Sequence, residues 1–298
     1  MANEYSVNQS DLVSVADAIR TKGGTSDALT FPGGFVDAVG AIQAGGDSQE
    51  IVEKFLTRTM TSIRCDSITV LPRYSLNEFK NLESVYFPEL VTTPFQMFQD
   101  CTSLKYVSMP KWTGAGSGSD TFVNCKSLTD ESFDMPLFVI MVHSCFKNCT
   151  GLKNVPNMLK LKQVGDMSLQ GCTGLTTLSF PEITTLGQLA FKGCTSLVFV
   201  DVGPKLNNHY TVGGVRNSVF EGCTSLVTVI LRPKTLQTLN NINAFTNTPI
   251  AAGEGYVYVP KVLSDGSDGV AAYRAATNWT VYADQIRAIE DYPEITGG

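Results

Sequence analysis

The 298-residue sequence is poor in charge and in histidine. Charged residues make up 17% of the chain, and there are two histidines. With 22 basic and 28 acidic residues the formal net charge is −6, so the basic excess that a nucleic-acid binder needs is missing. No run of 18 or more apolar residues occurs, which excludes a transmembrane helix. Hydrophobic residues nevertheless make up 43% of the sequence, and this content excludes a disordered chain.

The motifs of common enzyme classes are absent as well. There is no G-x-x-x-x-G-K-[ST] phosphate loop and no G-x-S-x-G elbow, because Gly116 stands where the serine would be. His143, Cys145 and Cys149 lack the fourth ligand of a zinc site. The segment 265–269 lacks the alternating ligands and terminal glutamate of a calcium loop. We therefore expect no catalytic residue, no metal and no cofactor.

The cysteines mark an internal repeat. Six of the eight recur at intervals of 24, 24, 23, 22 and 29 residues, each within the phrase Phe/Leu-x-x-Cys-x-Ser/Gly-Leu: Cys101, Cys125, Cys149, Cys172, Cys194 and Cys223. An earlier turn keeps Leu76, Phe79 and Leu82 without the cysteine, and a degenerate last turn begins at Phe245. A period of 22–24 residues is typical of leucine-rich repeats.

The residues that follow each repeat leucine predict the fold. They read L-x-x-L-x-L in most coils, as in Leu104-x-x-Val107-x-Met109, and a proline often ends the segment. Alternating apolar residues indicate a short strand with one buried face. A second apolar run, Ile183 to Leu186, suggests a short return strand. The sequence thus predicts a β-rich leucine-rich repeat solenoid of seven to eight coils, with short parallel strands stacked about 4.8 Å apart.

The repeat cysteines are predicted to be free thiols that fill the core. In a stacked ladder their Cβ vectors run parallel instead of facing each other, which disfavours disulfides. Two coils depart from the period: 111–121 is rich in glycine and serine, and 203–219 is about six residues longer than its counterparts. Such insertions map to loops on one face, where they either serve binding or reflect neutral drift.

The ends of the chain are different modules. We assign 1–45 to a helical attachment module, 46–50 to a linker, 51–254 to the solenoid and 255–298 to a C-terminal cap. The cap is expected to contain a final strand over 255–260 and a helical pattern over 269–289. Residues 1–50 carry 2 basic and 7 acidic side chains, so most of the net charge lies there. Their apolar stripe should form the attachment or oligomer interface, and the alternative is a helical cap that folds onto the chain's own solenoid. The stripe contains Leu12, Val15, Ile19, Phe31, Phe35, Val39 and Ile42.

The phrase F-x-x-C-T-S-L-x-x-V-x-x-P resembles the BspA-like leucine-rich repeat family over roughly residues 51–260, and 256–286 resembles the closing segment of that family. The stretch Val15 to Phe35 is similar to an N-terminal module of structural proteins from phages of Gram-positive bacteria. That resemblance implies attachment of a distal domain to the virion. The first ten residues are polar, so we expect no secretory signal. Cellular family members generally carry export signals and anchors, which favours a phage protein here.

Surface recognition is the remaining candidate activity. Outward strand positions place aromatic rings among small hydroxyls, a composition that suits a glycan or a protein ligand. The candidate ligand-binding residues are Tyr86, Tyr106, Ser108, Thr177, Phe199 and Asp201. The alternative is an ordinary β-surface, in which threonine and tyrosine are favoured anyway.

Three hypotheses of function remain open. The first is a non-enzymatic virion structural protein at the tail or baseplate, which binds the host surface; capsid decoration or a head fibre is its variant. It implies contacts with other virion proteins through the N-terminal helices, a homo-oligomer in the assembly, and neither nucleic-acid binding nor membrane insertion. The second is a bacterial or prophage-encoded adhesin that acts outside a virion. The third is a glycan hydrolase, which would need a carboxylate pair across a cleft.

Overall fold

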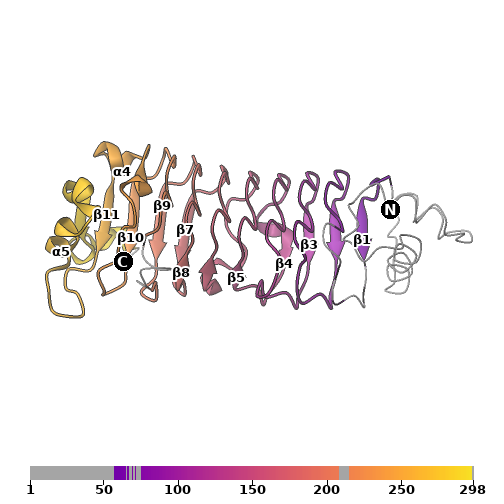
Figure 1. The fold of residues 1–298 in the computed structure, drawn as a ribbon, viewed down its shortest axis with the longest axis horizontal. Coiled ribbons are helices and arrows are strands. Elements are labelled where there is room, and N and C mark those ends of the chain that lie inside the picture. Colours follow the sequence, from indigo (N-terminus) through magenta and orange to yellow (C-terminus); the bar gives the residue numbers. More distant parts are fainter. Residues whose placement is uncertain are drawn as a thin grey trace, which may run out of the picture.

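The chain winds into a stack of coils that forms a long rod (Figure 1). The computed structural model describes residues 57–64, 66, 69, 71, 75–207 and 215–296. Successive coils pair their strands in parallel, which confirms the predicted leucine-rich repeat solenoid. The predicted module 1–45 with its apolar stripe from Leu12 to Ile42, the linker 46–50 and the middle of the 203–219 insertion lie outside the described residues. Within the described part, no helix is long and apolar enough to cross a membrane.

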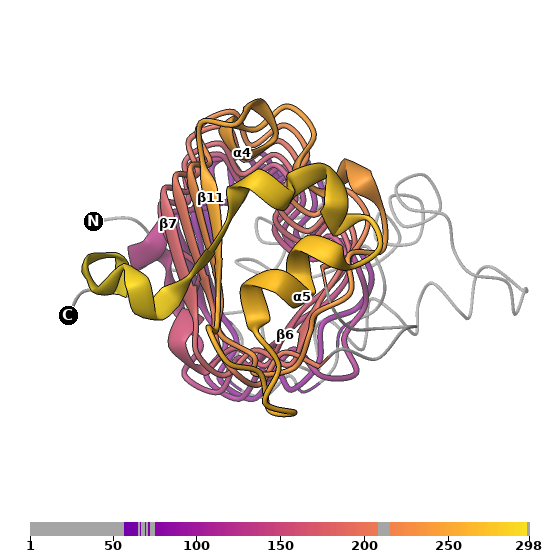
Figure 2. The same cartoon turned by 90° about the vertical axis from the view of Figure 1, so that its left-hand side faces the viewer.

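Two parallel sheets lie along one side of the rod (Figures 1 and 2). The first sheet contains β1 (Ser62–Arg64), β2 (Ser84–Tyr86), β3 (Tyr106–Ser108) and β4 (Phe133–Asp134). The second sheet contains β7 (Thr177–Phe180), β9 (Phe199–Val202), β10 (Thr228–Leu231), β11 (Tyr256–Val259) and β12 (Ile286–Ala288). The strands follow the repeat leucines as predicted, and their inward residues, such as Val107 and Val200, are fully buried.

The coil between the two sheets contributes no strand to this side. Its strand position holds Pro156, which has no backbone N–H to donate to a ladder. Asn157 is left-handed, with φ 49°, and leads into the 3-10 helix η2 (Met158–Lys160). The preceding coil carries a second irregularity, the 3-10 helix η1 (Asp130–Ser132), directly before β4. The outward face is therefore divided in two.

A third sheet lies on the opposite side of the rod (Figure 2). This return sheet contains β5 (Ile140–Met141), β6 (Gln163–Val164) and β8 (Thr185–Leu186), all parallel. The strand suggested by residues 183–186 is thus confirmed.

The glycine- and serine-rich segment 111–121 packs against the neighbouring coils. Trp112 is buried, its ring stacks on Phe138 at 4.6 Å between centroids, and its Nε1–H donates to Ser117 Oγ at 2.7 Å. A Cβ on Gly114 would lie 1.7 Å from the carbonyl oxygen of Ile140. The small residues therefore let two coils approach each other closely at this point.

The cysteine phrases form the turns at one edge of the coils. Their phenylalanine rings stack from coil to coil, with centroids 5.3 Å apart for Phe98 and Phe122 and 5.1 Å apart for Phe122 and Phe146. A second stack joins Phe220 to Phe191 and to Phe245, at 5.5 and 5.4 Å. These separations slightly exceed the strand spacing of about 4.8 Å, so the rings keep the coils in register.

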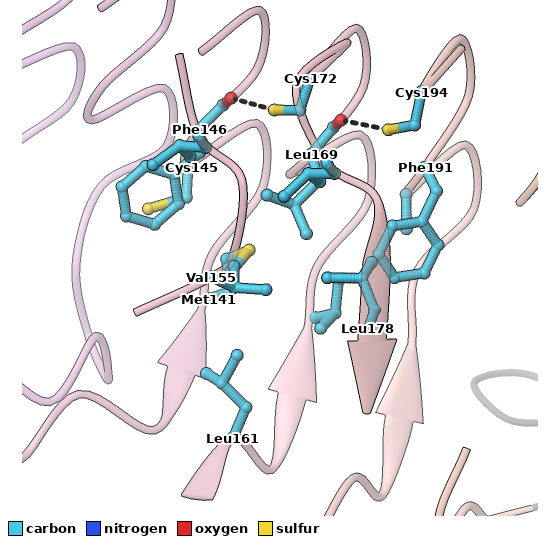
Figure 3. Packing of buried hydrophobic residues seen from close by; sticks show 14 of the residues in the cluster. Met141, Cys145, Phe146, Val155, Leu161, Leu169, Cys172, Leu178, Phe191 and Cys194 are labelled. Atoms are coloured by element: carbon cyan, nitrogen blue, oxygen red, sulfur yellow. Dashed lines mark hydrogen bonds between the residues drawn. The ribbon is translucent and has the colours of Figure 1, made fainter. Parts of the chain in front are cut away.

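The seven described cysteines are free and buried, which confirms the prediction for the six repeat cysteines. The thiol hydrogen bonds were not foreseen. Each repeat thiol donates to a backbone carbonyl oxygen of the preceding coil, as Cys172 does to Phe146 at 3.0 Å and Cys194 to Leu169 at 3.2 Å (Figure 3). Burial raises the pKa of the Cys101 and Cys172 thiols to about 12.

The residue before each of the six repeat cysteines is left-handed, and three of these residues form a side-chain ladder. Asp100, Asn124 and Asn148 have φ values of 62°, 63° and 60°. The amide of Asn124 donates to Asp100 Oδ1 at 2.7 Å, and that of Asn148 donates to Asn124 Oδ1 at 2.9 Å. The ladder ends at Gly171, where an added Cβ would lie 2.3 Å from Asn148 Oδ1.

The C-terminal segment adds strands and short helices to the end of the stack (Figure 2). Beyond η3 (Ile242–Phe245) and α4 (Pro249–Ala252), it contains α5 (Gly269–Ala275), η4 (Trp279–Gln285), η5 (Ile289–Asp291) and η6 (Pro293–Thr296). The rings of Trp279 and Tyr282 contact Phe245, the last ring of the second stack, at 6.1 and 5.2 Å. The helical pattern predicted over 269–289 is wrong at its end, because Ile286 pairs with Val257 as part of β12.

Candidate functional site

The outward positions of the two sheets form rows, because the parallel strands are in register. On the first sheet Ser84 lies opposite Tyr106, and Tyr86 lies opposite Ser108. On the second sheet Phe199 lies between Thr177 of β7 and Thr228 of β10. The six predicted ligand-binding residues are therefore not one site. Three lie on each sheet, and the coil without a strand separates them.

The outward face of β1 to β3 carries a surface that we call the tyrosine patch: Ser62, Ser84, Tyr86 and Tyr106. The Tyr106 side chain is 44% exposed. The guanidinium of Arg64 lies over the Tyr86 ring, 4.2 Å from its centroid. Directly before the strands, Lys105 Nζ pairs with Glu83 Oε1 at 3.1 Å. Rings, hydroxyls and paired charges thus adjoin one another on three neighbouring strands.

Ser108 was predicted to contact a ligand, and the structure contradicts this. Its side chain is fully buried, and its hydroxyl donates to Asp134 Oδ2 at 2.7 Å. Ser108 therefore connects β3 to β4 and does not offer a free hydroxyl to solvent.

Asp201 is also engaged within the protein. Its carboxylate oxygens accept hydrogen bonds from Arg232 Nε at 2.7 Å and Nη2 at 2.8 Å, a bidentate pair. These hydrogen bonds raise the pKa of the Arg232 guanidinium. The pair is partly exposed, so it contributes at most about 1 kcal/mol to stability. A ligand that contacts the Asp201 carboxylate would therefore also contact the Arg232 guanidinium.

The second sheet carries an apolar surface that sequence analysis did not identify in full. This valine patch contains Val198, Phe199, Val227 and Tyr256, of which Val198, Val227 and Tyr256 are 42%, 36% and 37% exposed. Arg287 lies over the Tyr256 ring at 4.5 Å. Val198 and Val227 directly follow the buried repeat leucines, the position that Glu83 and Lys105 occupy in the first sheet. Apolar residues at this position of the repeat could therefore have predicted the valine patch from the sequence.

The described residues contain no group of three or more histidine, cysteine, aspartate or glutamate side chains that could hold a metal ion. His143 is exposed, whereas Cys145 and Cys149 are buried. Asp265 accepts hydrogen bonds from Ser267 within a turn, and Asp268 caps the N-terminus of α5. These side chains therefore serve local structure.

Comparison with known proteins identifies the repeat. The family model for the BspA type leucine rich repeat region matches residues 53–129 and 69–198. A leucine rich cell surface protein from Faecalibacterium prausnitzii A2-165 is 12% identical, with 77% of this chain and 78% of that chain covered and a TM-score of 0.31. A leucine-rich repeat protein from Bacteroides ovatus ATCC 8483 is 18% identical, with 69% and 64% covered and a TM-score of 0.34. No curated protein matches the chain.

Proposed function

We propose that this chain, whose residues 53–129 and 69–198 match the BspA type leucine rich repeat model, is a non-enzymatic binding protein whose outward strand face contacts a glycan or a protein on a host cell surface. The observation that carries the proposal is the composition of that face. Large side chains are exposed on this side of the rod at two places. Tyr106 is exposed on the first sheet, and on the second sheet Tyr256 of β11 is exposed together with Val198 and Val227, which lie directly before β9 and β10. Aromatic and apolar groups of this kind form the centres of recognition surfaces.

The rigidity of the scaffold supports a binding role. The strands are held in register by the stacked phenylalanine rings and by the buried thiols, so the outward side chains have fixed spacings along the rod. Acidic side chains on this face are already engaged, Glu83 with Lys105 and Asp201 with Arg232. A hydrolase would instead need two carboxyl groups that face each other across a substrate.

The second part of the proposal concerns where the protein acts. Residues 15–35 resemble the N-terminal module of phage structural proteins, so we place the chain in a virion, at the tail or baseplate. In this arrangement residues 1–45 bind other virion proteins, several copies assemble around a symmetry axis, and the solenoid faces the host. A position as a capsid decoration or head fibre, or an adhesin that acts outside a virion, is the alternative.

The binding role is tested with purified protein and host cells. Tyr106→Ala and Phe199→Ala each remove an outward ring without touching an inward residue, and we expect at least one of them to weaken cell binding about tenfold. Unchanged binding by both variants would reject the outward face. Incubation with host cell-wall glycans should release no sugar, and released sugar would contradict a non-enzymatic role.

The virion placement has its own test. Mass spectrometry of purified phage particles should detect this chain, and electron microscopy should locate it at the tail or baseplate. Absence from the particles would favour the adhesin alternative, and a head position would favour the decoration or fibre.

A further inference from the structure

The tyrosine patch and the valine patch differ in chemistry although they lie on the same side of the rod. Exposed aliphatic side chains, Val198 and Val227, lie directly before β9 and β10 of the second sheet, whereas charged residues, Glu83 and Lys105, hold that position in the first sheet. Among the described outward residues of β1 to β3 there is no exposed aliphatic side chain. Since the centre of a protein–protein interface is enriched in apolar groups, the tyrosine patch is the poorer protein-binding surface of the two.

Charges at the tyrosine patch are paired with one another. Lys105 contacts Glu83 at 3.1 Å, and Arg64 contacts Asp66 at 3.1 Å while lying over Tyr86. Each pair sums to zero, so the patch offers no net charge to attract an ionic ligand. Asp134, which is exposed on the adjoining strand β4, would repel an acidic polymer at the border of the patch.

The same groups retain hydrogen-bonding capacity. An ammonium group has three donors and a carboxylate about four acceptor positions, and the contact between Lys105 and Glu83 uses one of each. Ser84 adds a hydroxyl directly opposite Tyr106. The aromatic rings supply apolar faces against which the C–H groups of a sugar can pack. Tyr86 and Tyr106 lie on adjacent strands and are offset by two residues in register, which places their Cα atoms about 8 Å apart, so one elongated ligand can contact both.

We propose that the tyrosine patch binds an uncharged, hydroxyl-rich glycan. This inference rests on the proposed binding function and assigns that ligand class to the part of the outward face formed by β1 to β3. The paired charges act as donors and acceptors for sugar hydroxyls, and Tyr106, the more exposed of the two rings, forms the stacking surface.

The test uses the full chain and two sets of purified polysaccharides, uncharged ones such as dextran, mannan and galactan, and acidic ones such as polygalacturonate. We expect binding within the uncharged set, with a Kd that stays the same between 50 and 500 mM salt, because no counterions are released. Tyr106→Ala should weaken this binding about tenfold, and Tyr106→Phe should retain it. The matched control is Phe95→Ala, which removes an aromatic residue of similar exposure, 40%, outside both patches and should leave the affinity unchanged. Tyr256→Ala tests the valine patch instead.

Three outcomes would overturn the inference. Binding only to acidic polymers, with an affinity that falls as salt rises, would show that charge governs recognition. A loss of affinity in Tyr256→Ala but not in Tyr106→Ala would move the site to the second sheet. Cell binding that survives periodate oxidation of the cell surface but not protease treatment would identify a protein ligand; the proposed binding function would then stand while the glycan assignment failed. Absence of any cell binding would instead contradict the proposed function itself.

Discussion

Raising the pH above 9 should destabilise the rod through its buried thiols. Burial raises the pKa of Cys101 and Cys172 to about 12, whereas a thiol in an unfolded chain has a pKa of about 8.5. Above that lower pKa the unfolded state releases a proton that the folded state retains. The free energy of unfolding therefore falls as pH rises from about 8.5 to about 12, and the thiol contribution is fully present below this window.

The size of the effect follows from the two thiols. One pKa unit corresponds to about 1.4 kcal/mol, so at pH 10.5, about two units above the unfolded pKa, each thiol costs roughly 2.7 kcal/mol. Together they remove about 5 kcal/mol, which is a large share of a typical stability of about 5–15 kcal/mol. Burial also raises the pKa of Cys125, Cys149 and Cys194, and these thiols add to the loss.

The assay is chemical denaturation under reducing conditions at pH 7.5, 9, 10 and 10.5, for the unmodified chain and for a Cys101→Ser/Cys172→Ser variant. The variant begins less stable, because it loses buried sulfur, so the comparison concerns the slopes. Between pH 9 and 10.5 the free energy of unfolding should fall less steeply in the variant than in the unmodified chain. The difference between the two slopes should be about 2.7 kcal/mol per pH unit, because the variant lacks two of the titrating thiols. Lysine and tyrosine titrate alike in both proteins. Equal slopes would refute the role of the buried thiols in this linkage.

Three further predictions concern stability and access. Gly171→Ala should destabilise the fold by at least about 1 kcal/mol more than Gly193→Ala, as measured by thermal denaturation. Both glycines have a φ of 73°, so the backbone strain is the same in the two variants. A Cβ at position 171 would meet Asn148 Oδ1, whereas nothing lies within 4 Å of a Cβ at position 193. A thiol reagent should label Cys149, in the middle of the stack, more slowly than the cysteines of the outer coils, since solenoids open from their ends; equal rates would indicate unfolding as one unit. Ser108→Ala should cost about 1 kcal/mol of stability and leave cell binding unchanged, because its hydroxyl serves Asp134.

The repeat made the coil and its core predictable from the sequence. A position such as Phe122 or Cys125 recurs in six phrases, and each recurrence has the same structural reason, so the register of strands and turns could be read from one coil and applied to the others. The thiol hydrogen bonds could not be predicted in this way. They depend on the distance between a thiol and a carbonyl of the preceding coil, which is set by how closely the coils stack.

The outward face was less predictable, because coils of irregular length determine which side chains of neighbouring coils contact each other. Alternation correctly placed Tyr106 and Phe199 outside, but it does not show whether a neighbour covers or pairs an outward side chain. Ser108 and its partner Asp134 are 26 residues apart, and Asp201 and Arg232 are 31 apart, so both pairs depend on coil lengths that differ from the period. Pro156 was a readable signal for the break in the sheet.

That break gives a last prediction about the extent of the site. β3 and β9, which carry Tyr106 and Phe199, are four coils apart, or about 19 Å at the usual strand spacing, and one of the coils between them carries η2 in place of a strand. A short glycan held by Tyr106 therefore does not reach Phe199, so Phe199→Ala should leave its affinity unchanged. The Tyr106→Ala/Phe199→Ala variant should then bind like Tyr106→Ala alone. If Phe199→Ala weakens binding of the same purified oligosaccharide, and its effect adds to that of Tyr106→Ala as independent contacts do, one ligand spans both patches across the break and the tyrosine patch is only part of a longer site.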